Sequence, residues 1–264
     1  IEGHEKILEI GGNIGRVSSI LATILDDDKN LLVLESNEKY YNQLKQNRDN
    51  NKFNFNIENA ALSKNKLYQF EWNTFNEEYK KTLTKEIQDQ LFEINIIDYE
   101  KLLEKYKIKF DTLILDCEGA FYFILKDFPN ILDNIKKIII ENDYLSYEHK
   151  LFVDDILISK GFSSKEKIPL DKKHWYRWKN QNIRDNFYEC WIKQDYQYLF
   201  RRNLDIHKNL DISKIKQKKP LKISIVGTHQ TGSTRVFNLF RLLYENLNKS
   251  VLSSSDYKHD KDLQ

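Results

Sequence analysis

The stretch Lys6-Ile-Leu-Glu-Ile-Gly-Gly-Asn-Ile-Gly15 decides the fold, and residues 16–25 continue it. The stretch begins with a short apolar run and ends in glycines, and residues 16–25 repeat apolar side chains at helical spacing. This order predicts a buried strand, a tight turn and a helix. Gly11 and Gly15 favour the turn because glycine has no Cβ and accepts backbone angles that other residues avoid. The N–H groups at the start of the helix would then face a ligand in the corner.

An acidic residue at the end of the next apolar run supports a nucleotide-binding corner. Residues 30–34 form that run, and Glu35 follows it, 20 residues after Gly15. In a Rossmann-like sheet, a carboxylate at this strand end is placed to accept hydrogen bonds from both ribose hydroxyls. The loop reads Glu-x-Gly-x-Asn-x-Gly from Glu9 to Gly15, rather than Gly-x-Gly-x-x-Gly. This difference favours S-adenosylmethionine over a dinucleotide.

The composition is that of a protein with an ordinary soluble surface and enough apolar residues for a core. Of 264 residues, 40% are hydrophobic and 31% are charged, and the net charge of +2 argues against a dedicated nucleic-acid binder. No apolar run approaches about 18 residues, so no membrane span is expected. Cys117 and Cys190 lack zinc-ligand spacing, which favours a reduced, cytoplasmic setting. Methionine is absent and Ile1 stands just before the first strand, so we expect a chain cut from a longer one.

The next part of the chain continues the predicted sheet and then loosens. Residues 53–57 alternate apolar and polar side chains as a third strand would, and Asn59 and Ala60 follow where such a fold covers an adenine. Over residues 64–91 the pattern predicts one extra strand near residues 67–72 and a charged, helix-like excursion over residues 76–91. This insert is either a specificity element or a solvated lid without a role.

Acidic residues end two further apolar runs. Residues 112–115 read as a buried strand, and Asp116 and Glu118 follow at its carboxyl end, where open α/β sheets bind ligands. The two carboxylates could orient a hydroxyl, accept a proton or hold a cation. Alternatively, Asp116 only caps the helix expected over residues 120–126. Residues 137–140 form the next strand, and Glu141 at its end is a third, weaker candidate.

The last two apolar segments flank an aromatic loop. Residues 162–168 and 187–193 read as an antiparallel pair that closes the sheet. The loop between them holds His174, Trp175, Tyr176, Arg177 and Trp178. These rings could stack on a sugar or a base, or they could serve as ordinary packing.

Taken together, the motifs resemble those of FkbM-type S-adenosylmethionine-dependent methyltransferases over residues 6–193. The resemblance is carried by Glu9-Ile-Gly-Gly-Asn-Ile-Gly15, Glu35-Ser-Asn, Asn59-Ala-Ala-Leu-Ser63, Asp116-Cys-Glu-Gly-Ala120 and Ile138-Ile-Ile-Glu-Asn-Asp143. It implies a class I, Rossmann-like fold with a mostly parallel sheet and an antiparallel closing strand. The activity it implies is O-methylation, often of a sugar or natural-product hydroxyl. One departure is Phe121, where the family commonly has an acidic residue.

The resemblance also assigns roles. Cofactor residues would be Glu9, Gly11, Gly12, Asn13, Gly15, Glu35, Ser36, Asn59 and Ala60. Candidate catalytic residues are Asp116, Glu118 and Glu141, and the need for a metal is left open. The expected acceptor is a small molecule or glycan, and the oligomeric state is not determined. The competing hypothesis is a methyltransferase fold without catalysis that binds a carbohydrate or a partner.

A second unit follows the methyltransferase domain expected over residues 1–205. Residues 206–220 are polar and lysine-rich and read as a linker, and residues 221–264 restart with a strand, a glycine loop and a helix. The loop, Gly-x-x-x-x-Gly-Ser-Thr, has the pattern of a phosphate-binding loop, but Ser233 replaces the Walker lysine. Its candidate phosphate-binding residues are Gly227, Thr231, Gly232, Ser233 and Thr234.

The glycine loop is similar to the loop by which sulfotransferases bind 3′-phosphoadenosine 5′-phosphosulfate. His229 and Gln230 stand where that family usually has a proline and a basic residue. The alternative is a glycine turn that binds nothing. Residues 227–264 are too few to complete a nucleotide-binding domain, so we expect the chain to end inside it.

Overall fold

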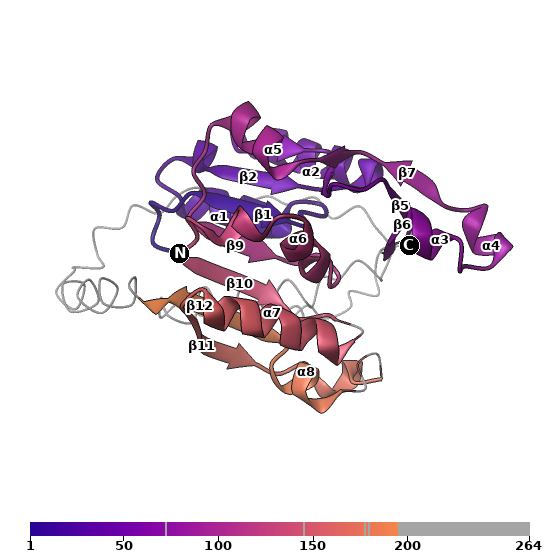
Figure 1. Ribbon diagram of the computed structural model, residues 1–264. Coiled ribbons are helices and arrows are strands. Elements are labelled where there is room, and N and C mark those ends of the chain that lie inside the picture. Colours follow the sequence, from indigo (N-terminus) through magenta and orange to yellow (C-terminus); the bar gives the residue numbers. More distant parts are fainter. Residues whose placement is uncertain (72, 145, 177, 179, 195–264) are drawn as a thin grey trace, which may run out of the picture. The chain divides into compact units, whose positions relative to one another are not determined.

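The computed structural model describes residues 1–194 except 72, 145, 177 and 179 (Figure 1). The predicted linker and the phosphate-binding loop with Gly227, Thr231, Gly232, Ser233 and Thr234 lie outside the described residues, so they stay predictions, as does the division into domains. No helix in the described part is both long and apolar enough to cross a membrane.

A seven-stranded sheet forms the centre, in the order β11-β12-β10-β9-β1-β2-β3. Five of its strands run parallel to one another: β1 (Ile7–Ile10), β2 (Leu31–Leu34), β3 (Asn56–Glu58), β9 (Thr112–Leu115) and β10 (Lys137–Glu141). Strand β12 (Tyr188–Lys193) lies between β10 and β11 (Phe162–Ile168) and is antiparallel to both. This arrangement confirms the predicted class I methyltransferase fold with its antiparallel closing strand.

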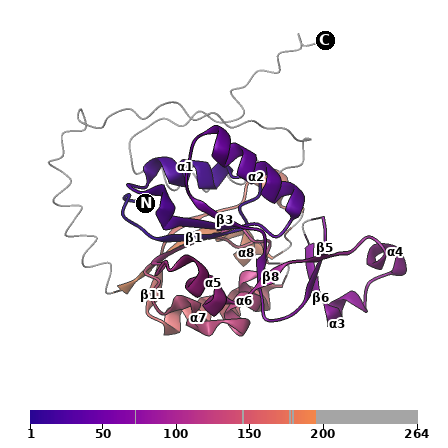
Figure 2. The same cartoon turned by 90° about the horizontal axis from the view of Figure 1, so that it is seen from above.

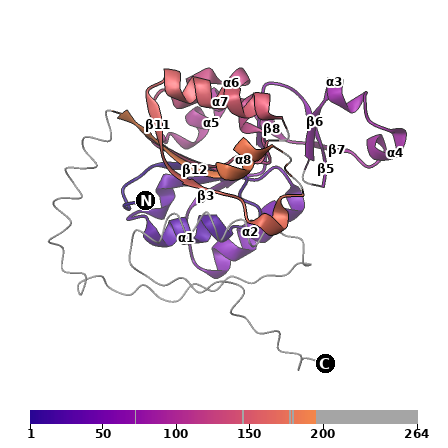
Figure 3. The same ribbon diagram turned by 90° about the horizontal axis from the view of Figure 1, so that it is seen from below.

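Helices cover both faces of this sheet, which explains why its central strands are continuous apolar runs. Figures 2 and 3 show α1 (Arg16–Ile24) and α2 (Glu38–Asn50) on one face. The other face carries α5 (Tyr99–Tyr106), α6 (Phe121–Asp127) and α7 (Tyr147–Ser159). Every residue of β1, β2, β9 and β10 is buried. All five parallel strands therefore end at one edge, where the candidate residues gather.

Three helices begin where local sequence chemistry predicts. The side chain of Asn37 accepts hydrogen bonds from the backbone of α2, and Asp98 does the same for α5. Ser146 accepts one from the N–H of Glu148 at the start of α7. These caps satisfy N–H groups that a helix leaves without a partner, so short-range sequence alone sets the helix boundaries here.

The insert contains the expected extra strand and a helical excursion within residues 76–91, as predicted. The extra strand, β5 (Leu67–Phe70), pairs with β6 (Asn73–Asn76) and β7 (Phe92–Ile94) in a three-stranded antiparallel sheet. Two short helices, α3 (Glu77–Lys80) and α4 (Lys85–Gln88), connect β6 to β7, and Figure 1 shows them beyond the small sheet. The Thr82 hydroxyl donates to the carbonyl of Tyr79 at 2.7 Å, which competes with helix continuation. A second small sheet pairs β4 (Ala61–Leu62) with β8 (Ile96–Ile97).

We expect Gly11→Ala to destabilise the fold far more than Gly161→Ala. Both glycines have left-handed backbone angles, with φ of +94° and +82°, so both substitutions carry the same intrinsic strain of about 1–2 kcal/mol. A Cβ at Gly11 would lie 1.8 Å from the carbonyl oxygen of Asp116, whereas a Cβ at Gly161 meets nothing within 4 Å. Overpacking adds about 1–3 kcal/mol at Gly11. Urea unfolding of both variants measures the difference, and equal losses would contradict the close contact.

Candidate active site

The glycine loop lies against its neighbouring strands at the carboxyl edge of the sheet. The N–H groups of Gly11 and Gly12 both donate to the carbonyl of Leu34 at 3.0 Å. A Cβ at Gly12 would lie 2.2 Å from Val33 Cγ1, and one at Gly15 would lie 2.4 Å from Leu44 Cδ1. The sequence suggested that these glycines make room for a ligand. The structure gives a packing reason as well, because neighbouring protein atoms fill the space that each Cβ would need.

Glu35 joins the glycine loop to the start of α2. One carboxylate oxygen accepts the N–H of Asn13 at 2.7 Å, and the other accepts the N–H of Asn37 at 2.7 Å. Asn13 has a φ of 47°, which turns its N–H toward this carboxylate. Each carboxylate oxygen keeps a second lone pair that can accept a ribose hydroxyl. Burial raises the pKa of Glu35 to about 7, although the two N–H donors oppose the shift.

Asn59 holds the end of β2 from the neighbouring strand. Its Nδ2 donates to the carbonyl of Glu35 at 2.8 Å and to that of Ser36 at 3.2 Å. The Ser36 hydroxyl in turn reaches the side-chain oxygen of Gln69 in β5 at 3.5 Å, a long contact that links the edge to the insert. Asn59 therefore positions Glu35 through the backbone. Ala60, the other residue expected near an adenine, is buried.

Glu9 is a buried acid with an acceptor that lacks a donor. Its side chain is 2% exposed, and within the described part of the chain its Oε2 has no hydrogen-bond partner; the same holds for Asn13 Oδ1. Burial raises the pKa of Glu9 to about 8, and the negative charges of Asp116 and Glu35 add to the shift. The Ser18 hydroxyl is near the carboxyl and opposes the shift.

These orphaned acceptors fit the proposed cofactor. A buried acceptor without a partner costs about 1–3 kcal/mol, so a native structure that keeps one needs an explanation. The amino-acid part of S-adenosylmethionine carries an ammonium, which has three donors. Glu9 and Asn13 are on β1 and the loop directly after it, where such a group would be held.

A group of three carboxylates lies beside the loop. Oxygens of Asp116, Glu118 and Asp143 are all within 4.8 Å of one another. Asp116 is half-buried, Glu118 is exposed and Asp143 is 3% exposed. Asp116 and Glu118 thus come together as predicted, and Asp143 joins them. Glu141, the predicted third candidate, is the buried last residue of β10 and is not in this group. Carboxylates this close favour a shared proton or a divalent cation.

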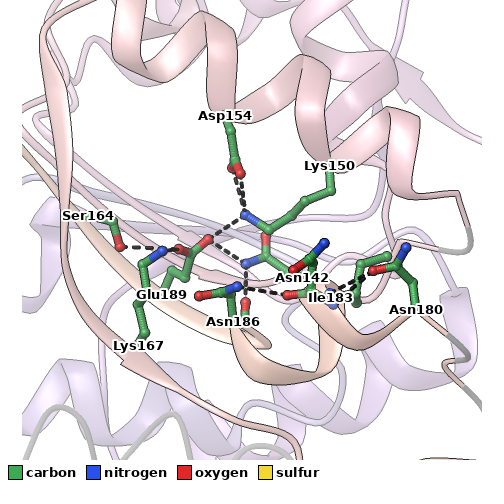
Figure 4. A network of polar contacts seen from close by, with 10 residues as sticks. Asn142, Lys150, Asp154, Ser164, Lys167, Asn180, Ile183, Asn186 and Glu189 are labelled. Atoms are coloured by element: carbon green, nitrogen blue, oxygen red, sulfur yellow. Dashed lines mark hydrogen bonds and ion pairs between the residues drawn. The ribbon is translucent and has the colours of Figure 1, made fainter.

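A buried polar network, shown in Figure 4, holds the segment that carries Asp143. Asn142 donates its backbone N–H to the carbonyl of Phe187 at 2.6 Å. Its side-chain Nδ2 donates to the carbonyl of Asn186 at 2.6 Å and to Glu189 Oε2 at 2.7 Å. Sequence reasoning missed this residue because its partners lie more than 40 positions along the chain. Asn142 fixes the backbone directly before Asp143.

Glu189 is the centre of this network and is fully buried. Its Oε2 also accepts from Lys150 Nζ at 2.6 Å, and its Oε1 contacts Ser164 Oγ at 3.1 Å and Lys167 Nζ at 3.2 Å. Lys150 donates further to both oxygens of Asp154. Burial pushes the pKa of Glu189 up, but Lys150 and the hydrogen bonds outweigh burial and hold it below the usual value. Glu189 and Lys150 therefore form a buried ion pair. Removal of either partner is costly because it leaves the other charge buried without its match.

Comparisons with known proteins find similarity of fold only. No family model and no curated protein matches the chain. A similar solved structure is the ribosomal protein L11 methylase from Lactobacillus delbrueckii subsp. bulgaricus, at 9% identity and a TM-score of 0.39 over 71% of this chain and 70% of that one. Another is an rRNA methylase from Streptococcus thermophilus, at 13% identity and a TM-score of 0.40 over 73% of this chain and 89% of that one.

A third similar structure is magnesium protoporphyrin IX methyltransferase from Synechocystis PCC 6803 with bound S-adenosylmethionine. It shares 10% identity and a TM-score of 0.40 over 73% of this chain and 71% of that one. The fold assignment itself rests on the strand order of the chain. The resemblances to FkbM-type enzymes and to sulfotransferases stay predictions.

We expect Glu9 to destabilise the ligand-free protein as the pH rises from about 4.5 to about 8. Its pKa is about 8 in the folded state against 4.5 for the ordinary group, so folding takes up a proton in this window. Relative to wild type, Glu9→Gln should therefore gain about 1 kcal/mol of unfolding free energy per pH unit. Urea unfolding between pH 5 and 8 measures this slope. The exposed Glu104→Gln is the control, and a Glu9→Gln variant that follows it would contradict the assigned pKa.

Proposed function

We propose that this protein is an S-adenosylmethionine-dependent O-methyltransferase that acts on a hydroxyl of a sugar, a glycan or a related small molecule. The observation that carries the proposal is the set of buried acceptors on two neighbouring strand ends. Glu9 and Asn13 offer oxygens without donors, and Glu35 follows the adjacent strand. This is the edge of an α/β sheet where ligands bind. The order of charges and glycines there agrees with the family resemblance in the sequence.

Each part of the cofactor has a proposed partner. Glu9 and the loop from Gly11 to Gly15 would hold its amino-acid part. Glu35 would accept the ribose hydroxyls through the lone pairs that its backbone donors leave available. Ser36, Asn59 and Ala60 would border the adenine, with Asn59 acting through its bonds to the β2 end. When bound, the cofactor supplies a methyl group already activated by its sulfonium.

The protein's part in the transfer is alignment and proton removal. Asp116 is the proposed base, because it is half-buried at the end of β9 and would take the acceptor hydroxyl's proton. Glu118 and Asp143 lie beside it, and the three carboxylates together could hold a divalent cation. Glu141 is buried nearby on β10 and stays a weaker candidate. Holding the hydroxyl in line with the methyl group supplies the rest of the rate.

The competing function is a binding module that has lost catalysis. Phe121, which replaces an acidic residue common in the family, is fully buried at the start of α6, so this position serves the core. That observation favours the module. The buried acceptors of Glu9 and Asn13 favour the enzyme, because a module without a cofactor has no use for orphaned polar groups that cost stability.

For the cofactor, isothermal titration with S-adenosylmethionine should give saturable binding, and Glu35→Gln should weaken it by about 1.5–3 kcal/mol. The amide keeps one acceptor but turns the other into a donor that faces a backbone N–H. Glu58→Gln is the matched control, because Glu58 ends the neighbouring strand β3 and binds Lys105 and Tyr106 instead. Absence of heat with the wild type would end the proposal. Unchanged affinity in folded Glu35→Gln would move the ribose to another residue.

For the transfer step, Asp116→Asn should keep S-adenosylmethionine affinity and lower methyl transfer to hydroxyl acceptors about 10²–10⁴-fold. The amide keeps the shape but cannot take a proton. Asp133→Asn, on the exposed surface near Lys160, is the control. The assay follows labelled methyl groups into a panel of sugars, with and without EDTA. Full activity in Asp116→Asn would exclude it as the base, and loss of activity with EDTA would assign the three carboxylates to a cation first.

A further inference from the structure

The loop between β11 and β12 concentrates positive charge beside the candidate active site. Residues 170–186 hold five basic and two acidic side chains, a net charge of +3, while the whole chain has +2. The basic residues are Lys172, Lys173, Arg177, Lys179 and Arg184. The rest of the chain is thus slightly negative, so the excess positive charge of the sequence is concentrated in this loop.

Hydrogen bonds fasten this loop to the segment that carries Asp143. The N–H of Leu170 donates to the carbonyl of Arg184 at 2.7 Å, which brings the two ends of the loop together. Asn142 then binds the carbonyls of Asn186 and Phe187, where the loop ends (Figure 4). The end of the cationic loop is therefore bonded to Asn142, the residue directly before Asp143 of the carboxylate group.

Aromatic side chains give the loop a fixed shape. Trp178 is 5% exposed and meets the ring of Phe187 edge-on at 4.9 Å. The Trp175 indole N–H donates to the carbonyl of Leu170 at 3.0 Å. Tyr176, by contrast, is 71% exposed. Of the two alternatives from the sequence, packing applies to Trp178, whereas the ring of Tyr176 is exposed.

Two cations lie over the Trp175 ring without a matching acid. The Arg184 guanidinium is 4.5 Å from the ring centre, and Lys172 Nζ is 5.8 Å from it. Neither forms an ion pair within the described residues, and Arg184 Nε is buried without a hydrogen-bond partner. Of the two acids in this segment, Asp171 pairs with Lys173 at 3.1 Å, and Asp185 accepts from Gln181 Nε2 at 3.3 Å. The stacked guanidinium is held in place, with donors suited to an oxyanion.

We propose that this loop binds a phosphate group of the acceptor, so that the substrate is a phosphorylated sugar. The proposal rests on the proposed function and names its substrate class. A dianionic phosphate matches the Arg184 fork together with the point charge of Lys172. The carboxylates at Asp116, Glu118 and Asp143 repel an anion, so the phosphate stays on the loop while the neutral hydroxyl reaches the acids. Tyr176 offers an exposed ring on which the sugar can stack.

In the test, the full chain is held in the presence of S-adenosylmethionine. It is then titrated separately with glucose 6-phosphate, with glucose and with a short single-stranded RNA. Calorimetry and tryptophan fluorescence follow binding, and Trp175→Phe identifies the part of the signal that comes from the loop. We expect glucose 6-phosphate to bind and glucose not to bind detectably. Arg184→Gln should weaken binding at least about 10-fold, and Arg184→Lys should lose less because the charge remains. Lys160→Gln, an exposed lysine of α7's C-terminal end, should change nothing.

Three results would overturn the inference. Equal binding of glucose would show that the phosphate is not recognised. Equal weakening in Lys160→Gln and Arg184→Gln would show a diffuse surface charge rather than a site. Binding of RNA without glucose 6-phosphate would make the loop a nucleic-acid surface.

Cofactor titration keeps this inference separate from the proposed function. Arg184→Gln should bind S-adenosylmethionine as the wild type does. An unchanged unfolding transition would show that the variant loses glucose 6-phosphate binding without misfolding. If S-adenosylmethionine binds and the sugar phosphate does not, only the substrate class is wrong. If the sugar phosphate binds without the cofactor binding, the proposed reaction fails and the phosphate site stands.

Discussion

The carboxylate of Glu35 is the interaction on which the candidate site depends. It is buried at the end of β2 and accepts one backbone N–H from the glycine loop and one from the start of α2. Asn59, directly after β3, holds the same strand end. Three parts of the fold therefore meet at one residue, two at its side chain and one at its backbone carbonyl. Hydrogen-bond donors lower the cost of burying a carboxylate, and here the donors are backbone N–H groups of the glycine loop and of the start of α2.

Electrostatic strain at this edge gives a physical reason to bind a cation. Glu9 and Glu35 both have pKa values raised by burial, and the charge of Asp116 acts on Glu9. Groups shifted in this way by burial and by neighbouring charges are characteristic of functional sites. S-adenosylmethionine carries a sulfonium and an ammonium, so its binding would relieve the repulsion. The same negative charge would keep an anionic acceptor group away from the acids, which fits the separate cationic loop after β11.

The network around Glu189 gives the site its rigidity on the other side. Lys150 and Asn142 connect α7, β12 and the end of β10 through fully buried contacts. Removing any one partner leaves a buried charge or amide without its match. Asp143 and the aromatic loop are both attached to this network through Asn142. The transfer site and the proposed phosphate site therefore share one support, which would fix the distance between the reacting hydroxyl and the phosphate.

The sequence by itself determined the sheet and the edge at which its candidate residues lie. Strands such as β9 (Thr112–Leu115) are buried on both faces, so each must be a continuous apolar run that can be read locally. The helix starts at Asn37, Asp98 and Ser146 each depend on a side chain that bonds a backbone N–H two or three residues later. They can therefore also be read from the local sequence. The candidate acids come directly after these strands in the sequence, and parallel strands end at the same edge of the sheet, so their shared location could be predicted.

Only the tertiary structure decided which of these residues meet. Asp143 rather than Glu141 joins Asp116 and Glu118, because hydrogen bonds from Asn142 to residues more than 40 positions away set that backbone. The insert holds the strand and the helical turns that its sequence predicts, but only the tertiary structure shows that β5 pairs with both β6 and β7. Gly12 and Gly15 leave room for the side chains of Val33 and Leu44, and no local sequence pattern reveals these contacts. Local chemistry fixes the elements, whereas contacts between distant residues fix the site.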